Sequence, residues 1–306
     1  MTAARGAITW RELRSAAARR LRDAAAPNPG NEGRWIVEEA SGWSGAELVA
    51  AELELATDGA RRRVDAMVER RLLGEPLQYV LGSWQFCGLD LFVDPRVLIP
   101  RQETEIVAQR AVDEAERFGG RRGGRDAWTG SATDYAVADL GTGSGAIALA
   151  LATMLTDAQV WATDGSEDAL AVARANVAGI GAAGARVRVG HGDWFEALPP
   201  ELRGGLRVIV SNPPYLRDDE VDDLPPEVRG HEPRGALVSG PTGLEATARI
   251  VQEAPAWLVP GGSLVVEVDA RRAEESAALA SRAGFADVWV DDDLAGRPRV
   301  LVARLT

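Results

Sequence analysis

An apolar, strand-like segment ends in a turn whose residue types suggest chemistry. The letters VIVS at 208–211 are followed by Asn212, Pro213, Pro214 and Tyr215. Proline lacks a backbone N–H and has a fixed φ, so the pair ends the strand and stiffens the chain. The Asn212 side chain and the Pro213 carbonyl are expected to accept both protons of a primary amine or amide, with Tyr215 stacked on the flat group. The turn holds no strong base, nucleophile or metal ligand, which favours a reaction that depends on positioning.

A glycine-rich turn upstream has the features of a nucleotide-binding loop. The segment ADLGTGSGAIALA at 138–150 predicts a strand before Gly141 and a helix that begins near Gly145. Gly141 and Gly143 permit a tight turn and a close approach to a ligand, and the free N–H groups of the helix start favour an anionic group. The spacing also fits the dinucleotide fingerprint with Ala146 in third place. The loop alone therefore leaves a nicotinamide cofactor and another adenosine ligand open.

The ends of the next two predicted strands carry further candidate ligands. Asp164 is expected to accept the two hydroxyls of an adenosine ribose, in NAD or in S-adenosylmethionine alike. Asp193 is expected to meet an adenine amino group. Trp194 is expected to cover the adenine ring, with an ordinary core position as the alternative. His191 is interpreted as a loop residue rather than a base.

The elements that position these residues change character along the chain. Apolar residues at helical spacing predict a helical domain at 1–80. Its Arg-rich start resembles a transit peptide, but Glu12 and Asp23 interrupt that pattern and favour a first helix. A β-hairpin linker is predicted at 81–98, and alternating strands and helices predict a parallel, doubly wound sheet in an α/β domain at 99–306. The last two strands are expected to pair, and the Gly/Arg-rich 117–134 is expected to be a flexible loop.

Composition narrows the class of partner. The chain of 306 residues has a net charge of −12, and residues 1–80 are neutral, so the acidity belongs to 81–306. An acidic domain argues against binding of a nucleic-acid backbone and suits a basic protein partner or simple solubility. Cys87 is the single cysteine, which suits a reducing compartment, and the two histidines form no zinc-ligand pattern. A cytoplasmic protein without a metal and without a membrane span is expected.

Several long motifs, in this order, resemble the HemK/PrmC family of protein-(glutamine-N5) methyltransferases that act on peptide chain release factors. The resemblance covers nearly the whole chain and rests on the segments GEPLQYVLGSWQFCGLDLFVDPRVLIPRQETEIV, VADLGTGSGAIALALA, SNPPYL, HEPRGALVSGPTGLE and LAGRPRVLVARL. One departure follows GGSLVVE, where Val268 and Asp269 stand in place of the family's usual Ile-Gly. This departure leaves the conformation of that loop open.

The resemblance implies a Rossmann-like class I fold that uses S-adenosyl-L-methionine and releases S-adenosyl-L-homocysteine. The methionine part of the cofactor would lie against Gly141, Thr142, Gly143, Ser144 and Gly145. Asp164 would hold the ribose, Trp194 would flank the adenine, and Asn212 would touch both cofactor and substrate. Residues 212–215 would clasp the target glutamine amide. The helical domain would recognise the substrate. The segment IPRQETE at 99–105 would pack beside the cofactor mouth, with Arg101 and Glu103 structural rather than catalytic.

The expected partner is a release factor, bound by a monomer with no nucleic acid or membrane involved. A ribosomal-protein glutamine methyltransferase is the nearest alternative. An adenine-N6 methyltransferase of nucleic acid and a nicotinamide-dependent dehydrogenase are more distant ones. The acidic residues at 218–223 are expected either to face a basic loop of the substrate or to form a solvated turn.

Overall fold

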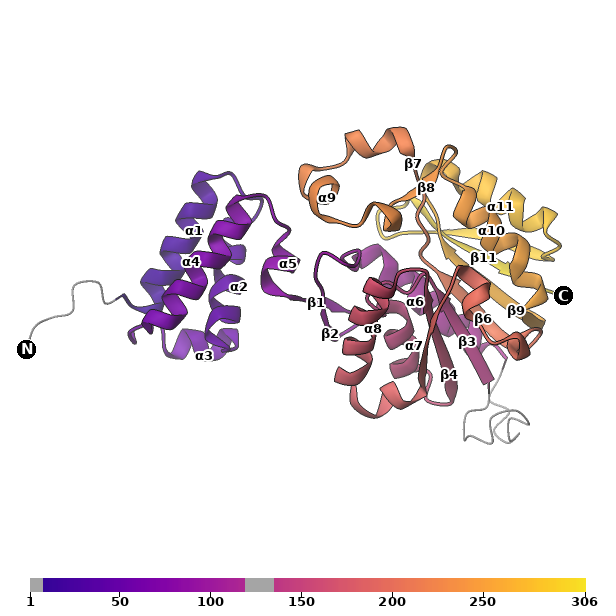
Figure 1. Cartoon of the computed structure of the whole chain (residues 1–306), viewed down its shortest axis with the longest axis horizontal. Coiled ribbons are helices and arrows are strands. Elements are labelled where there is room, and N and C mark those ends of the chain that lie inside the picture. Colours follow the sequence, from indigo (N-terminus) through magenta and orange to yellow (C-terminus); the bar gives the residue numbers. More distant parts are fainter. Residues whose placement is uncertain (1–7, 119–134) are drawn as a thin grey trace, which may run out of the picture. The chain divides into compact units, whose positions relative to one another are not determined.

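The computed structural model describes residues 8–118 and 135–306 and divides into two compact units (Figure 1). The helical unit comprises Met1–Ser83 with Pro226–His231, and the sheet unit comprises Trp84–Pro225 with Glu232–Thr306. Most of the predicted loop at 117–134 lies outside the described residues.

The helical unit packs amphipathic helices around their apolar faces. It contains α1 (Trp10–Asp23), α2 (Pro29–Ser41), α3 (Gly45–Ala50), α4 (Asp58–Leu72), α5 (Leu77–Leu81) and α9 (Pro226–His231). A capping box between Thr9 and Glu12 satisfies backbone N–H groups at the start of α1. A Cβ on Gly33 would lie 2.8 Å from the backbone nitrogen of Ala18, so α1 and α2 pack closely there. The predicted N-terminal helical region is confirmed.

The sheet unit is built on seven strands in the order β10-β11-β9-β6-β3-β4-β5. The strands are β3 (Tyr135–Leu140), β4 (Ala158–Asp164), β5 (Val187–His191), β6 (Leu206–Ser211), β9 (Leu258–Glu267), β10 (Asp287–Asp292) and β11 (Pro298–Arg304). The five from β9 to β5 are parallel, and β11 pairs antiparallel with both β9 and β10. The predicted parallel sheet with a final pair of strands is therefore confirmed.

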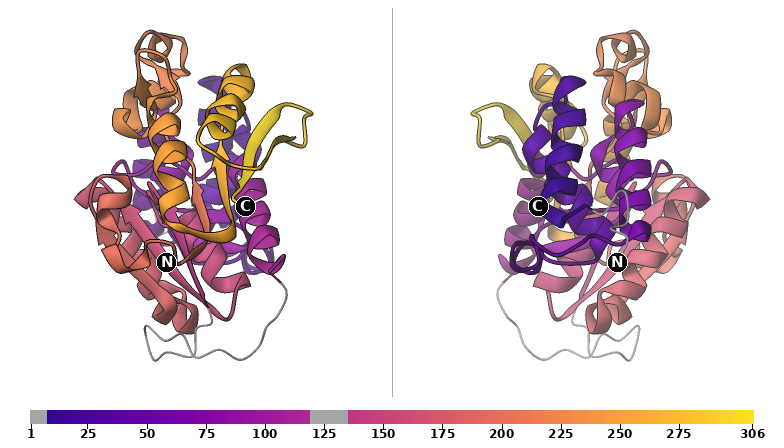
Figure 2. Two further views of the ribbon diagram at one scale, coloured as in Figure 1. Left: turned by 90° about the vertical axis from the view of Figure 1, so that its right-hand side faces the viewer. Right: turned by 90° about the vertical axis from the view of Figure 1, so that its left-hand side faces the viewer.

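Helices cover both faces of this sheet because its strands are apolar on both sides. They are α6 (Gln102–Glu116), α7 (Ala146–Met154), α8 (Glu167–Gly179), α10 (Glu245–Glu253) and α11 (Ala273–Arg282). Val137 and Val208 pack in one cluster with residues of α6 and α7. The next residues along the same strands, Ala138 and Ile209, pack in the other cluster with α10 and α11. Figures 1 and 2 show α10 and α11 lying side by side.

Two small sheets flank the main one. β1 (Ser83–Phe86) and β2 (Leu89–Phe92) form the predicted hairpin, and its turn residues Cys87 and Gly88 both have positive φ, at 48° and 76°. β7 (Leu216–Arg217) pairs in parallel with β8 (Val238–Gly240). β7 directly follows the Asn-Pro-Pro-Tyr turn, so this second small sheet anchors the far side of that turn.

A buried carboxylate joins α6 to the sheet. Glu114 accepts two hydrogen bonds from Arg304 on β11, at 2.9 and 2.8 Å, and one from Ser263 on β9 at 2.7 Å. Burial acts to raise the pKa of Glu114, but these hydrogen bonds and one from Arg117 outweigh it and hold the pKa at about 2. Glu114 is therefore ionised at neutral pH and fixes the helix that carries Thr104.

Candidate active site

The strand order places the two sequence motifs side by side. After β3 the chain adds β4 and β5 on one side of it, whereas β6 and β9 are added on the opposite side. The direction in which strands are added therefore reverses between β3 and β6. Ligands of doubly wound sheets bind at this point, outside the carboxyl ends of the strands. Leu140 and Ser211 are partners across β3 and β6, and Ser211 Oγ donates to the Leu140 carbonyl at 2.7 Å. Gly141 and Asn212 follow them directly.

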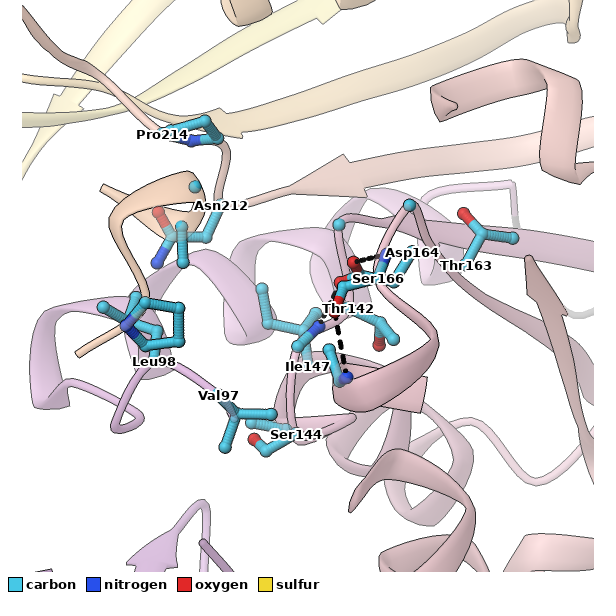
Figure 3. A pocket seen from close by; sticks show the side chains of 18 of the residues that line it. Val97, Leu98, Thr142, Ser144, Ile147, Thr163, Asp164, Ser166, Asn212 and Pro214 are labelled. Atoms are coloured by element: carbon cyan, nitrogen blue, oxygen red, sulfur yellow. Dashed lines mark hydrogen bonds between the residues drawn. The ribbon is translucent and has the colours of Figure 1, made fainter. Parts of the chain in front are cut away.

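A cavity of about 480 Å³ opens at this edge of the sheet. Figure 3 shows Asn212 and Pro214 on one side of it and Thr142, Asp164 and Ser166 on the other. Most of the predicted site residues line it: Gly141, Thr142, Gly143, Ser144, Asp164, Asp193, Trp194, Asn212 and Pro214. Gly145, Pro213 and Tyr215 are not among the described residues that line it.

The glycine turn is held by a buried acid that the sequence prediction missed. Gly141 and Gly143 have φ values of 71° and 56°, where glycine has no steric penalty. One oxygen of Asp139 accepts from the Thr142 hydroxyl at 2.6 Å and from the Ala148 N–H at 3.0 Å. The other has no hydrogen-bond partner among the described residues. Burial raises the pKa of Asp139 to about 7. This carboxyl therefore fixes the turn to the start of α7.

Asp164 ends β4 and faces the glycine turn, as the sequence predicts. Its carboxylate accepts the backbone N–H groups of Gly143 and Ser166, each at 2.9 Å (Figure 3). Burial raises the pKa of Asp164 in spite of these two hydrogen bonds. Each oxygen keeps a second lone pair for a hydroxyl. The geometry is compatible with a ribose ligand.

Trp194 both lines the cavity and packs against the apolar cluster beside α10 and α11, and its predicted contact with an adenine ring stays a prediction. A Cβ on Gly141 would lie 3.4 Å from Trp194 Cζ3, so the ring rests against the glycine turn. The backbone of Trp194 has a φ of 50°, which is rare for a bulky residue. Asp193 forms an ion pair with Arg249 on α10, which the sequence did not reveal.

The asparagine of the proline turn points into a network. Asn212 Nδ2 donates to Thr104 Oγ1 at 3.1 Å, and Thr104 also lines the cavity.

Burial raises the pKa of Tyr215 to about 12, and the nearby carboxylate of Glu267 adds to the shift. Tyr215 is therefore a neutral phenol that lies within the influence of a buried acid. Its predicted stacking on a substrate stays a prediction.

The acids that follow the turn are paired within the protein. Asp218 pairs with Arg234 and Asp219 with Arg217, each at 2.9 Å. Glu220 accepts from Arg272 at 2.7 and 2.8 Å. Glu220 is a buried anchor of this segment, whereas Asp218 and Asp219 form exposed ion pairs. Their predicted contact with a basic loop of the substrate stays a prediction.

The departure at Val268 and Asp269 lies outside the cavity wall. Val268 is buried in the apolar cluster beside α11. Asp269 pairs with Arg271 at 2.6 Å and with Arg272 at 3.0 Å. Because Arg272 also binds Glu220, this loop braces the segment after the Asn-Pro-Pro-Tyr turn.

Two further segments contribute to the cavity wall: the first overlaps IPRQETE at 99–105, which the resemblance placed beside the cofactor mouth, and the second was given no site role from sequence. Residues 97, 98 and 100 form one side and residues 233, 235 and 236 the other. Glu232 connects them, because it accepts from the Ile99 N–H at 3.4 Å and from Arg101 Nη2. Burial raises the pKa of Glu232, although Arg101 opposes the shift. A signal was present, since both segments belong to long motifs of the family.

The described residues contain no group of three or more His, Cys, Asp or Glu side chains arranged to hold a metal ion. Within the same part of the chain, no helix is long and apolar enough to cross a membrane.

The mostly parallel seven-stranded sheet carries the glycine turn, Asp164 and the Asn-Pro-Pro-Tyr turn at its carboxyl edge, and its fold is that of a class I methyltransferase. The family profile "PrmC N-terminal domain" matches residues 12–82, and "Methyltransferase small domain" matches residues 129–224.

Three curated relatives carry the name release factor glutamine methyltransferase. The protein of Geobacter sulfurreducens is 41% identical over 78% of this chain and 76% of its own length. That of Bordetella pertussis is 41% identical over 89% and 93%, and that of Moorella thermoacetica is 38% identical over 97% and 98%. The chain belongs to the release factor glutamine methyltransferase family. The resemblance inferred from the sequence motifs is confirmed, and membership implies the use of S-adenosylmethionine.

Proposed function

We propose that the protein transfers a methyl group from S-adenosylmethionine to the side-chain nitrogen of a glutamine in the Gly-Gly-Gln loop of a peptide chain release factor. The observation that carries this proposal is that Asn212 shares one cavity with the glycine turn and Asp164. The names of the relatives support the choice of protein substrate. The net charge of −12 argues against a nucleic-acid substrate. We expect a monomer that acts in the cytoplasm.

The cavity fits the cofactor. Its volume of about 480 Å³ suits a small-molecule ligand. A Cβ built on Gly143 meets nothing within 4 Å, so the turn leaves room beside its backbone. The residues from Gly141 to Ser144 would hold the methionine part, Asp164 the ribose, and Trp194 the adenine. When bound, the cofactor supplies a methyl group on a positively charged sulfur.

The protein's own task is to position a poor nucleophile. The lone pair of an amide nitrogen is delocalised, so the nitrogen attacks weakly. An acceptor aimed at its N–H groups draws electron density toward the nitrogen and fixes its direction. Asn212 Oδ1 is the side-chain acceptor that we assign to this role. The displaced proton leaves to water, so a dedicated base is not required. The second acceptor predicted at the Pro213 carbonyl stays a prediction.

The test is a purified reaction with release factor and labelled S-adenosylmethionine, read by mass spectrometry of the glutamine peptide. We expect methylation by the native protein and none by Asn212→Ala, with the same melting temperature within a few degrees. Turnover retained in Asn212→Ala would refute the role of that residue. Ribosomal proteins in a parallel reaction test the nearest alternative substrate, and binding of NADH in place of S-adenosylmethionine would support a dehydrogenase.

A further inference from the structure

Two hydrogen bonds in series connect Asn212 to the interior of the sheet unit. Asn212 Nδ2 donates to Thr104 Oγ1 at 3.1 Å, and Thr104 Oγ1 donates to Glu267 Oε2 at 2.6 Å. Thr104 lies in the first turn of α6, and Glu267 is the last residue of β9, which neighbours β6. Their exposed fractions are 4% and 1%. The series therefore runs from the cavity wall to a buried carboxylate.

The direction of the series follows from the protons that each group carries. The Thr104 hydroxyl has a single proton, and it donates that proton to Glu267 Oε2. Thr104 Oγ1 then offers only lone pairs to Asn212, and the NH₂ end of an amide is the end that donates. The oxygen and nitrogen of a planar amide point in different directions, so Asn212 Oδ1 is turned away from Thr104. Because the two ends are nearly equal in size, hydrogen bonds decide which way the amide lies.

We propose that Thr104 and Glu267 are positioning residues, which fix the Asn212 amide so that Oδ1 faces the NH₂ group of the substrate. This inference rests on the proposed function. A reversed amide would present N–H donors to the N–H groups of the glutamine, and the two would repel. The fixed orientation presents an acceptor that needs no reorganisation when substrate arrives.

Glu267 acts through its neighbours and not on the substrate. It does not line the cavity, and Thr104 lies between it and Asn212. Its closest cation is Arg299, with Nη1 at 3.9 Å from Oε1. Among the described residues, Thr104 supplies the one side-chain hydrogen bond to the Glu267 carboxyl group, at 2.6 Å, and burial raises the pKa of that group.

The experiment compares two isosteric variants that change hydrogen bonding with one variant that keeps the hydroxyl. Thr104→Val removes the hydroxyl, Thr104→Ser keeps it, and Glu267→Gln replaces an acceptor with a group that also donates. Thr247→Val is the matched control, because Thr247 on α10 is also buried, at 1% exposed against 4% for Thr104, and does not line the cavity. For each protein, kcat and KM for the release factor, the Kd of S-adenosylhomocysteine and the melting temperature are measured.

We expect Thr104→Val to lower kcat roughly ten- to a hundredfold, by analogy with the loss of one oriented group at a reacting centre. Glu267→Gln is expected to lower kcat by roughly three- to tenfold, because it permits either orientation of the amide. The Kd of S-adenosylhomocysteine stays within about threefold, and Thr104→Ser recovers most of kcat. A purely structural role predicts instead that kcat, Kd and melting temperature fall together and that Thr247→Val behaves like Thr104→Val. Native kcat in Thr104→Val, or no recovery in Thr104→Ser, overturns the proposal.

A second measurement does not depend on turnover. The NH₂ protons of Asn212, observed by ¹⁵N NMR, are expected to exchange slowly in the native protein and in Thr104→Ser. They are expected to exchange faster in Thr104→Val and Glu267→Gln. Unchanged exchange in both of these variants overturns the proposal. If the native protein methylates no glutamine, the proposed function fails while this measurement still decides the orientation of Asn212.

Discussion

Gly143 offers a sharp test of where the cofactor lies. Its φ of 56° lies in the left-handed region, and a Cβ built there meets nothing within 4 Å. Gly204 is a matched control, because its φ is 68°, its Cβ also meets nothing, and it lies outside the cavity. Of the two glycines, only Gly143 lines the site.

The expected magnitudes separate backbone strain from ligand contact. Alanine in the left-handed region destabilises the folded state by about 1–2 kcal/mol. Alanine also restricts the unfolded chain more than glycine does, which offsets about 0.4–1 kcal/mol of that loss. Gly143→Ala and Gly204→Ala are therefore each expected to lose about 1 kcal/mol of stability, or about 2–4 °C in melting temperature. A methyl group forced against a ligand costs a further 1–3 kcal/mol or so. Gly143→Ala alone is thus expected to weaken S-adenosylhomocysteine binding by roughly tenfold or more.

Isothermal titration calorimetry measures the affinity of each variant for S-adenosylhomocysteine, and thermal denaturation measures its loss of melting temperature. Equal affinities in Gly143→Ala, Gly204→Ala and the native protein, together with equal losses of melting temperature, would refute the reasoning. That result would show that the ligand does not lie against Gly143.

The remaining predictions concern stability and the cavity wall. The lowered pKa of Glu114 adds stability above its ordinary pKa of 4.5, and this contribution is lost as the pH falls toward 2. Compared with Asp113→Asn on the same helix, Glu114→Gln is expected to lower the free energy of unfolding by about 3 kcal/mol at pH 7. At pH 3 the difference in the free energy of unfolding between these two variants is expected to be about 2 kcal/mol smaller. Urea denaturation at both pH values measures it, and a difference that does not change with pH would contradict this account. Arg249→Ala releases Asp193 beside Trp194 and is expected to weaken S-adenosylhomocysteine binding by about two- to fivefold. Calorimetry that finds the native Kd would argue against this role of the ion pair.

The parts of the site that local patterns encode were predictable from the sequence. The glycine turn and Asp164 are strand-end features, and the rule for doubly wound sheets places strand ends at one edge. The same rule predicts that Asn212 joins them. Each of these residues carries its signal within a few positions of itself.

The parts that depend on distant contacts were not predictable. Thr104 is 108 positions from Asn212, and Glu232 is 133 positions from Ile99, and no periodicity records such a pairing. The turn at Pro213 and Tyr215 was recognised, but its residue types do not say which groups face the cavity.

The pairing of β3 with β6 has a consequence for how the site comes into being. Leu140 and Ser211 are neighbours in the sheet, yet 71 residues separate them along the chain. A chain synthesised only as far as β5 has the glycine turn and Asp164 but lacks Asn212. Contacts of such long range close a large loop and are slow to form. Asn212 therefore joins the cofactor pocket only when β6 pairs with β3. A ligand that contacts both Asn212 and the glycine turn stabilises this pairing by its binding free energy.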